Sequence, residues 1–154
     1  MFDELELAYL AGFFDGDGSI TISMLKDKTK VRKVGHQVQV LLTQNPPCPI
    51  LYELLEEFGG KIYKNSKTCH ALSWRCPAAS HIRFLESILP YLRIKKVAAE
   101  IAVEYQQGVD SKPAHRRVTD EEWDARMALY ERMQDSFDER AMTMHGRARE
   151  QRAE

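Results

Sequence analysis

The sequence predicts an α+β domain in which helices pack on one face of an antiparallel sheet. Segments with helical and with alternating hydrophobic periodicity follow one another in the order helix, two strands, helix, two strands, helices. The chain has 154 residues, 44% of them hydrophobic, which is enough for one well-buried core. We expect residues 1–108 to form this core and residues 109–154 to form a C-terminal helical extension packed on the same domain.

The first helix is predicted from Asp3 to about Asp15. Asp3 can cap its amino end, and Glu6, three residues later, can reach back to the cap amide. One apolar face follows i, i+3, i+4, i+7 spacing and consists of Leu7, Leu10, Ala11 and Phe14.

Ala8 and Gly12 form a second face of this helix, made of small residues. Gly costs about 1 kcal/mol relative to Ala inside a helix, so its presence there needs a reason. We expect another helix to approach closely at this face.

Two alternating segments, Ser19 to Leu25 and about Val31 to Thr43, are predicted to pair as a long, half-exposed β-ribbon. The charged segment 26–30 is the expected turn between them. Val38, Val40 and Leu42 face inward, and the prolines that follow end the second strand.

The rest of the core is predicted as a short helix, two strands and two helices. Their expected ranges are Ile50 to Phe58, Lys61 to about Asn65, Cys69 to Cys76, about Pro77 to Pro90, and Lys95 to Gln107. In the strand that ends at Cys76, Trp74 faces inward whereas Ser73 and Arg75 face outward. Thr119 and Glu122 have the spacing of a capping box and begin a last helix.

Composition argues against several classes of protein. The three cysteines are an odd number without CxxC spacing, which argues against a disulfide framework or a zinc ribbon. The amino-terminal stretch has no basic residues before an apolar run, and no stretch approaches the roughly 18 apolar residues that span a bilayer. We therefore expect an intracellular, reducing compartment and no membrane partner.

The net charge of −1 conceals an uneven distribution. Residues 1–25 hold five acids and no Lys or Arg, residues 26–96 hold thirteen Lys and Arg against five acids, and residues 97–154 hold nine against thirteen. A basic middle is typical of a phosphate-binding surface, because Lys and Arg there displace condensed counterions. The alternative is an ordinary solvated sheet face.

The end of the first helix carries two acids that alternate with glycines. The segment reads Leu10-Ala11-Gly12-Phe13-Phe14-Asp15-Gly16-Asp17-Gly18. An EF-hand calcium loop starting at Asp15 would need Gly at its sixth position and Glu at its twelfth, where this chain has Ile20 and Lys26. A hairpin turn that merely carries acids is the other alternative, since Asp-Gly pairs are common turn formers.

This segment, extended by Ser19 and Ile20, resembles the signature of LAGLIDADG homing endonucleases, in particular their single-motif, homodimeric members. The likeness covers about residues 3–107, because the element order matches the family's α-β-β-α-β-β-α fold, an antiparallel saddle-shaped sheet with helices on one face. Two further stretches resemble family members, namely Leu42-Thr43-Gln44 and the run from Pro90 to Lys96.

The resemblance implies a site built by two copies of the chain. The motif helices of two protomers would pack together through Ala8 and Gly12, and each would present Asp17 to a divalent metal at the centre of a DNA site. Gly16 would add a backbone carbonyl ligand. Two carboxylates at two helix C-termini repel each other unless cations lie between them. Magnesium suits such a site, and Mn²⁺ or Ca²⁺ are expected to substitute for it in binding.

The same resemblance assigns catalytic roles to Gln44, which would orient water and metal ligands, and to Lys95, which would place a cation beside the scissile phosphate. The alternative for Gln44 is a polar residue that merely ends a strand, and the alternative for Lys95 is a solvated lysine at the start of a helix. Some members carry a further basic residue shortly after the Gln, where this chain has Asn45-Pro46-Pro47-Cys48. The alternatives are a thinner basic shell in this chain, or a charge supplied by Arg93 or Lys96.

Outward side chains of the ribbons are expected to read double-stranded DNA, because a two-stranded ribbon fits the major groove. The candidates for base contact are Thr21, Ser23, Gln37, Gln39, Thr43, Ser73 and Arg75. The candidates for phosphate contact, in turns and at ribbon edges, are Lys26, Lys28, Lys30, Arg32, Lys33, Lys61, Lys64 and Lys67. The pattern leaves open which face of the strand that begins at Lys61 meets DNA.

The expected function is that of a homodimeric, magnesium-dependent, sequence-specific endonuclease that cuts both strands of a long pseudo-palindromic DNA site. One alternative is an RNA maturase that assists intron splicing, with intron RNA as its partner. Another is a catalytically silent DNA-binding regulator on the same scaffold. A purely structural α+β domain would leave the basic middle of the chain unexplained.

Overall fold

The computed structural model describes residues 1–26, 32, 34–64, 70–112 and 117–150, with side chains as far as residue 138. The elements are α1 (Glu4–Asp17), β1 (Gly18–Lys26), β2 (Val34–Gln44), α2 (Pro49–Phe58), β3 (Lys61–Lys64), β4 (Leu72–Arg75), the 3₁₀ turn η1 (Ala78–Ser80), α3 (His81–Ile88), the 3₁₀ turn η2 (Leu89–Tyr91), α4 (Lys96–Asp110) and α5 (Asp120–Glu150). The α+β class and the predicted order of helices and strands are confirmed.

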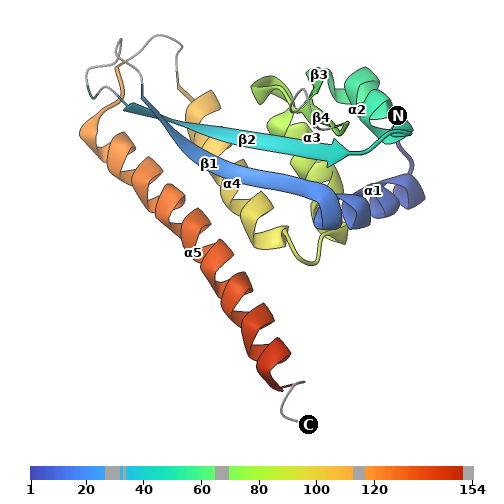
Figure 1. Ribbon diagram of the computed structural model, residues 1–154. Coiled ribbons are helices and arrows are strands. Elements are labelled where there is room, and N and C mark those ends of the chain that lie inside the picture. Colours follow the sequence, from blue (N-terminus) through green and yellow to red (C-terminus); the bar gives the residue numbers. More distant parts are fainter. Residues whose placement is uncertain (27–31, 33, 65–69, 113–116, 151–154) are drawn as a thin grey trace.

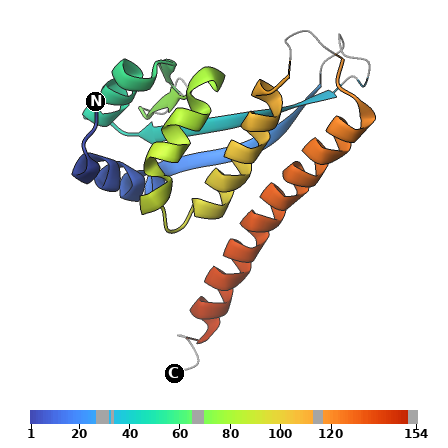
Figure 2. The same cartoon turned by 180° about the vertical axis from the view of Figure 1, so that it is seen from behind.

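The four strands form one antiparallel sheet in the order β1-β2-β4-β3. β1 and β2 pair from Gly18 opposite Leu42 to Lys26 opposite Val34, whereas β4 joins β2 only over Leu41–Gln44. The end of the ribbon at Lys26 and Val34 is therefore two-stranded within the described part of the chain. The helices lie on one face of the sheet, as the two opposite views show (Figures 1 and 2).

The core lies between the sheet and the helices. The predicted apolar face of α1 is confirmed, since Leu10, Ala11 and Phe14 have no exposed surface. The capping box at the start of α1 is also present. The centre of the Phe84 ring, on α3, lies 5.1 to 5.4 Å from the ring centres of Phe14, Phe58 and Trp74. Sequence periodicity did not identify this aromatic cluster.

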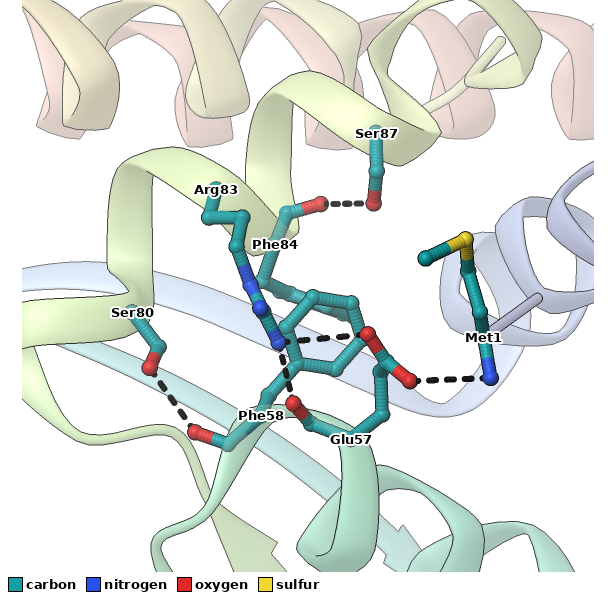
Figure 3. A network of polar contacts seen from close by, with 7 residues as sticks. All are labelled: Met1, Glu57, Phe58, Ser80, Arg83, Phe84 and Ser87. Atoms are coloured by element: carbon teal, nitrogen blue, oxygen red, sulfur yellow. Dashed lines mark hydrogen bonds and ion pairs between the residues drawn. The ribbon is translucent and has the colours of Figure 1, made fainter.

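α2 and α3 are joined by a polar network at the edge of this core (Figure 3). The Arg83 guanidinium donates to the backbone carbonyl of Glu57 and also lies 3.4 Å from its carboxylate. Ser80 Oγ donates to the carbonyl of Phe58 at 2.8 Å. The two α2 carbonyls lie in its last turn, so these donors satisfy groups that a helix end leaves without an internal partner.

Two predicted elements differ in detail. The helix expected from about Pro77 to Pro90 is instead η1, α3 and η2, because Pro90 lies in a 3₁₀ turn after the α-helix has ended at Ile88. Of the strand expected from Cys69 to Cys76, Cys69 lies outside the described residues and Leu72–Arg75 form the ladder with β2 and β3. The amide of Cys76 then donates to the Val40 carbonyl of β2 at 3.0 Å.

α5 packs along α4 and reaches the ribbon at its amino end (Figures 1 and 2). Met133 has no exposed surface, and Arg132 binds Glu104 of α4 at 2.9 Å. The predicted capping box is present, with Thr119 and Glu122 exchanging hydrogen bonds at 3.0 and 3.2 Å. None of the described helices is both long and apolar enough to cross a bilayer.

Candidate metal centre and nucleic-acid interface

The end of α1 brings an acid and an amide together. Asp17 is the last residue of α1 and is exposed, and Gln44 is the last residue of β2. β1 follows α1 directly and pairs Gly18 with Leu42, which sets the two side chains side by side. Gln44 Nε2 donates to Asp17 Oδ2 at 3.1 Å, and Gln44 Oε1 accepts from the Asn45 amide at 2.9 Å.

Asp15, the other acid of the segment, is buried and has a structural role. Its carboxylate is 8% exposed and accepts the backbone amides of Arg93, Ile94 and Lys95 at 2.7, 3.2 and 2.9 Å. It thereby fixes the segment that leads into α4 against the end of α1. A sequence signal was available, because Asp15 lies four residues after the buried Ala11 and so falls on the buried face of the helix.

Lys95 also contacts the end of α1. It is the cap residue before α4, and its Nζ donates to the backbone carbonyl of Asp15. That carbonyl directly precedes Gly16, the predicted carbonyl ligand, which is exposed. The structure thus gathers Asp17, Gln44 and Lys95 at the end of α1, with Asp15 as the group that links Lys95 to it.

The donors at this place suit a cation that needs few protein ligands. Within the described residues, no group of three or more His, Cys, Asp or Glu side chains could hold a metal ion. A metal at Asp17 would therefore complete its shell with carbonyl, amide, water or phosphate oxygens, which is how magnesium is commonly bound.

The face of the sheet opposite the helices carries the polar side chains of the ribbon. Pairing places Thr21 opposite Gln39 and Ser23 opposite Gln37, while the alternating residues Val38 and Val40 are buried. We call this the open face. On β4 and β3 it continues through Ser73, Arg75, Lys61 and Tyr63, because these residues pair with one another and with Leu41 and Thr43.

This pairing decides which side of β3 belongs to the open face. Lys61 and Tyr63 lie there, and the Arg75 guanidinium stacks over the Tyr63 ring at 5.5 Å. Lys64 pairs with Leu72 and shares the helix side of the sheet with Ile62. Lys26 pairs with Val34 and alternates with the open-face residues of β1, so it too lies on the helix side of the sheet.

Ser73 corrects one prediction. It lies on the predicted face, but its side chain is 1% exposed and its Oγ lies 2.6 Å from Thr43 Oγ1. A small residue on β4 has neighbours in both adjacent strands, here Thr43 and Tyr63, and their larger side chains cover it. Its hydroxyl is therefore not available to a base.

The described structure does not reach every predicted phosphate contact. Lys28, Lys30, Lys33 and Lys67 lie outside the described residues. Arg32 is described, but its guanidinium forms an ion pair with Asp120 and donates to the carbonyl of Val118 at 3.4 Å. The acid at the start of α5 therefore engages this arginine within the chain.

Three comparisons relate this geometry to known proteins. A comparison with curated protein sequences found no match. Homing endonuclease I-CvuI in complex with its target, in the presence of calcium, is 25% identical with a TM-score of 0.62 and covers 69% of this chain and 68% of that one. I-CvuI with the I-CreI target in the presence of magnesium is 19% identical, with a TM-score of 0.63 and coverages of 86% and 95%.

The group I intron-encoded homing endonuclease I-CeuI, complexed with DNA, has a TM-score of 0.72 at 21% identity, with coverages of 86% and 68%. At 19% and 21% identity, the likeness to I-CvuI in the presence of magnesium and to I-CeuI shows a shared fold only. The family model described as LAGLIDADG endonuclease matches residues 10–107, which include the second half of α1 from Leu10, the whole sheet, α2 and α3, and most of α4. Because this match spans well over half of the sequence, the chain belongs to the LAGLIDADG endonuclease family.

Proposed function

We propose that the protein is a homodimeric, magnesium-dependent endonuclease that recognises a long pseudo-palindromic DNA site and cuts both strands. The observation that carries the proposal is the Asp17 carboxylate held 3.1 Å from the Gln44 carboxamide, where the end of α1 meets the sheet. Membership of the LAGLIDADG endonuclease family supports the reaction class.

Magnesium fits the groups at this place. Asp17 would bind it through the carboxylate and Gly16 through the backbone carbonyl, with water and phosphate oxygens completing the shell. When bound, the metal would activate a water and stabilise the charge that develops on the phosphate. The I-CvuI complexes that resemble this chain were solved in the presence of calcium or of magnesium, which supports a divalent ion, with Ca²⁺ or Mn²⁺ able to replace it in binding.

The protein groups around the metal would orient it and supply charge. Gln44 restrains Asp17 Oδ2 and so fixes the direction of the other carboxylate oxygen. Lys95 would bring a positive charge to the scissile phosphate. Asp15 fixes the backbone from which Lys95 projects, through hydrogen bonds to three successive amides.

A second copy of the chain would complete the site. α1 exposes Leu5 and Tyr9, at 81% and 64%, beside the small residues Ala8 and Gly12. A Cβ at Gly12 would meet no atom within 4 Å, so this face is open to a close neighbour. Packing two α1 helices here would bring two Asp17 carboxylates to one place, and bound cations would offset their repulsion.

The open face would bind DNA in the major groove. Side chains proposed to contact bases are Thr21, Ser23, Gln37, Gln39, Thr43 and Arg75. Lys61 on the open face, and Lys26 and Lys64 at sheet edges, are proposed to contact phosphates.

Cleavage of a randomised duplex library by the purified protein, with the products sequenced, tests this function. The wild-type protein should cut in Mg²⁺ and not in EDTA. The Asp17→Asn protein should bind the selected site with an affinity close to that of wild type and should not cut it. Cleavage by Asp17→Asn in Mg²⁺ would refute the assignment of Asp17.

Two other results would indicate a different function. Site-specific DNA binding without cleavage in any divalent metal would indicate a DNA-binding regulator. Tighter binding of intron RNA than of duplex DNA would indicate an RNA maturase.

A further inference from the structure

The far end of the β1–β2 ribbon is held by the start of α5. Arg32, next to the beginning of β2, is paired with Asp120, and its guanidinium lies 5.0 Å from the centre of the Trp123 ring. Its side chain is only 27% exposed. An arginine that is partly desolvated, paired with a carboxylate and stacked on an indole is a specific contact, in contrast to an isolated surface ion pair.

His36 extends this contact along β2. Its ring lies 4.7 Å from the Trp123 ring and 5.7 Å from the Tyr130 ring, both on α5. The Tyr105 hydroxyl of α4 donates to the backbone carbonyl of His36 at 3.0 Å. We call Arg32, His36, Tyr105, Trp123 and Tyr130 the ribbon clamp.

The ribbon clamp contacts the helix side of the ribbon. His36 alternates with Gln37 along β2 and shares its side with the buried Val38. Ser23 and Gln37, which pair across the ribbon, therefore point away from the clamp and towards the open face. The clamp restrains the backbone beneath these two residues without occupying the face that they present.

The ribbon needs such support at this end. β4 pairs with β2 from Leu41 onward, and the amide of Cys76, directly after β4, donates to the Val40 carbonyl at 3.0 Å. In the described residues the stretch from Val34 to Gln39 therefore has β1 as its single sheet neighbour. Two-stranded ribbons are marginally stable alone and twist more than larger sheets. Ser23 is six residues beyond Asp17, which at about 3.3 Å per residue is roughly 20 Å along the strand.

We propose that the ribbon clamp sets the sequence preference at the outer base pairs of the DNA site, by fixing the position of Ser23 and Gln37. This inference rests on the proposed function. Arg32 acts in it as a positioning residue that α5 engages, whereas Ser23 and Gln37 make the base contacts. Base pairs near the centre of the site, closer to Asp17, lie beside the part of the sheet that β4 supports, and their readout is independent of the clamp.

The test compares cleavage profiles of a randomised duplex library for the full-length wild-type, Trp123→Ala and Arg132→Ala proteins. Arg132 is the matched control, because it binds Glu104 on α4 from the same helix α5. Trp123→Ala should relax the preference at the outer positions by about fivefold or more, the lower limit for a lost base contact. The preference at central positions should stay as in wild type, and Arg132→Ala should match wild type throughout.

A folded Trp123→Ala protein with the wild-type profile would overturn the inference, as would one that loses central and outer preference equally. If Trp123→Ala does not fold, Arg32→Gln decides the matter, since it leaves the indole in place. It should relax the outer preference, whereas loss of a phosphate contact alone would weaken binding to all sequences alike and would overturn the inference. A wild-type protein that neither binds nor cuts duplex DNA would refute the proposed function itself.

Discussion

At the scale of single residues, the two acids of the motif have opposite environments although only Gly16 separates them. Asp15 is buried and accepts three backbone amides, whereas Asp17 is exposed and accepts one side-chain amide. The first carboxylate holds backbone amides within the fold, and the second is the one that we propose binds a cation. Removing each charge should therefore affect different properties of the protein.

Asp15→Asn should destabilise the fold, because the NH₂ group of Asn cannot accept the amides that one carboxylate oxygen now accepts. A buried hydrogen-bonding group left without its partner costs about 1 to 3 kcal/mol. Asp17→Asn should leave stability within about 0.5 kcal/mol of wild type, as for most exposed substitutions. Urea unfolding of both variants measures the difference, and equal loss of stability in the two would contradict the structural role of Asp15.

His81 should make stability depend on pH. It is 3% exposed, and burial lowers its pKa from the ordinary 6.5, although contacts with Gln106 and the Cys76 carbonyl partly oppose this shift. As pH falls below about 6.5, the unfolded chain gains a proton at His81 that the folded protein resists. Stability contributed by the neutral imidazole is therefore lost between about pH 6.5 and the lower folded-state pKa.

Urea unfolding at intervals from pH 7 to pH 5 tests this prediction by comparing wild type with His81→Gln. The free energy of unfolding should fall with acidification in both proteins, because acidic residues titrate in both. The fall should be steeper in wild type, because only wild type has the His81 imidazole. Parallel curves would show that His81 contributes nothing to the pH dependence.

At the scale of elements, Gly18 controls how α1 passes into β1. A Cβ at Gly18 would lie 2.6 Å from the Phe14 ring and from the Phe14 carbonyl oxygen, closer than side chains approach one another. The backbone at Gly18 is ordinary, with φ of −78°, so the requirement is one of space. This close passage is what lets Asp17 end the helix beside Gln44.

Gly18→Ala should destabilise the protein by about 1 to 3 kcal/mol, the usual cost of overpacking. Gly16→Ala is the matched control, because a Cβ there meets nothing within 4 Å and Ala favours the helix. Thermal unfolding of the two variants should give a lower midpoint for Gly18→Ala and an unchanged or higher one for Gly16→Ala. The reverse order would contradict the geometry of this junction.

Lys61 and Lys64, the first and last residues of β3, lie on opposite faces of the sheet and should contribute differently to DNA binding. Lys61 is on the open face and Lys64 is on the helix side. Each phosphate contact contributes about 0.9 to the slope of log affinity against log salt concentration. Lys61→Ala should therefore lower that slope by about 0.9 per engaged protomer. Lys64→Ala should lower it by less, because Lys64 would reach a phosphate only around the sheet edge from the helix side.

Binding of the selected duplex measured at several salt concentrations gives these slopes for both variants and for wild type. Equal slopes for Lys61→Ala and wild type would place the DNA elsewhere than on the open face.

At the scale of the whole molecule, local signals predicted the elements but not the long-range contacts. The capping boxes that begin with Asp3 and Thr119 involve residues three apart, so a short stretch of sequence contains the whole signal. The exposure of Ser73 depends on strands to either side, and Arg32 meets Asp120 across 88 residues, which no periodicity encodes. The grouping of Asp17 with Gln44 and Lys95 was expected only through resemblance to a family.

The assembly itself gives the final prediction. If α1 packs against a second copy, association stabilises the folded state by mass action, and the thermal midpoint should rise with protein concentration. Gly12→Leu adds a bulky side chain at the proposed interface and should give a monomer with a concentration-independent midpoint. Gly108→Leu is the matched control, because Gly108 is also an exposed helical glycine whose added Cβ would meet nothing within 4 Å. Sedimentation equilibrium and thermal unfolding over a wide range of concentrations separate the two variants, and a Gly12→Leu protein that still sediments as a dimer would exclude α1 as the interface.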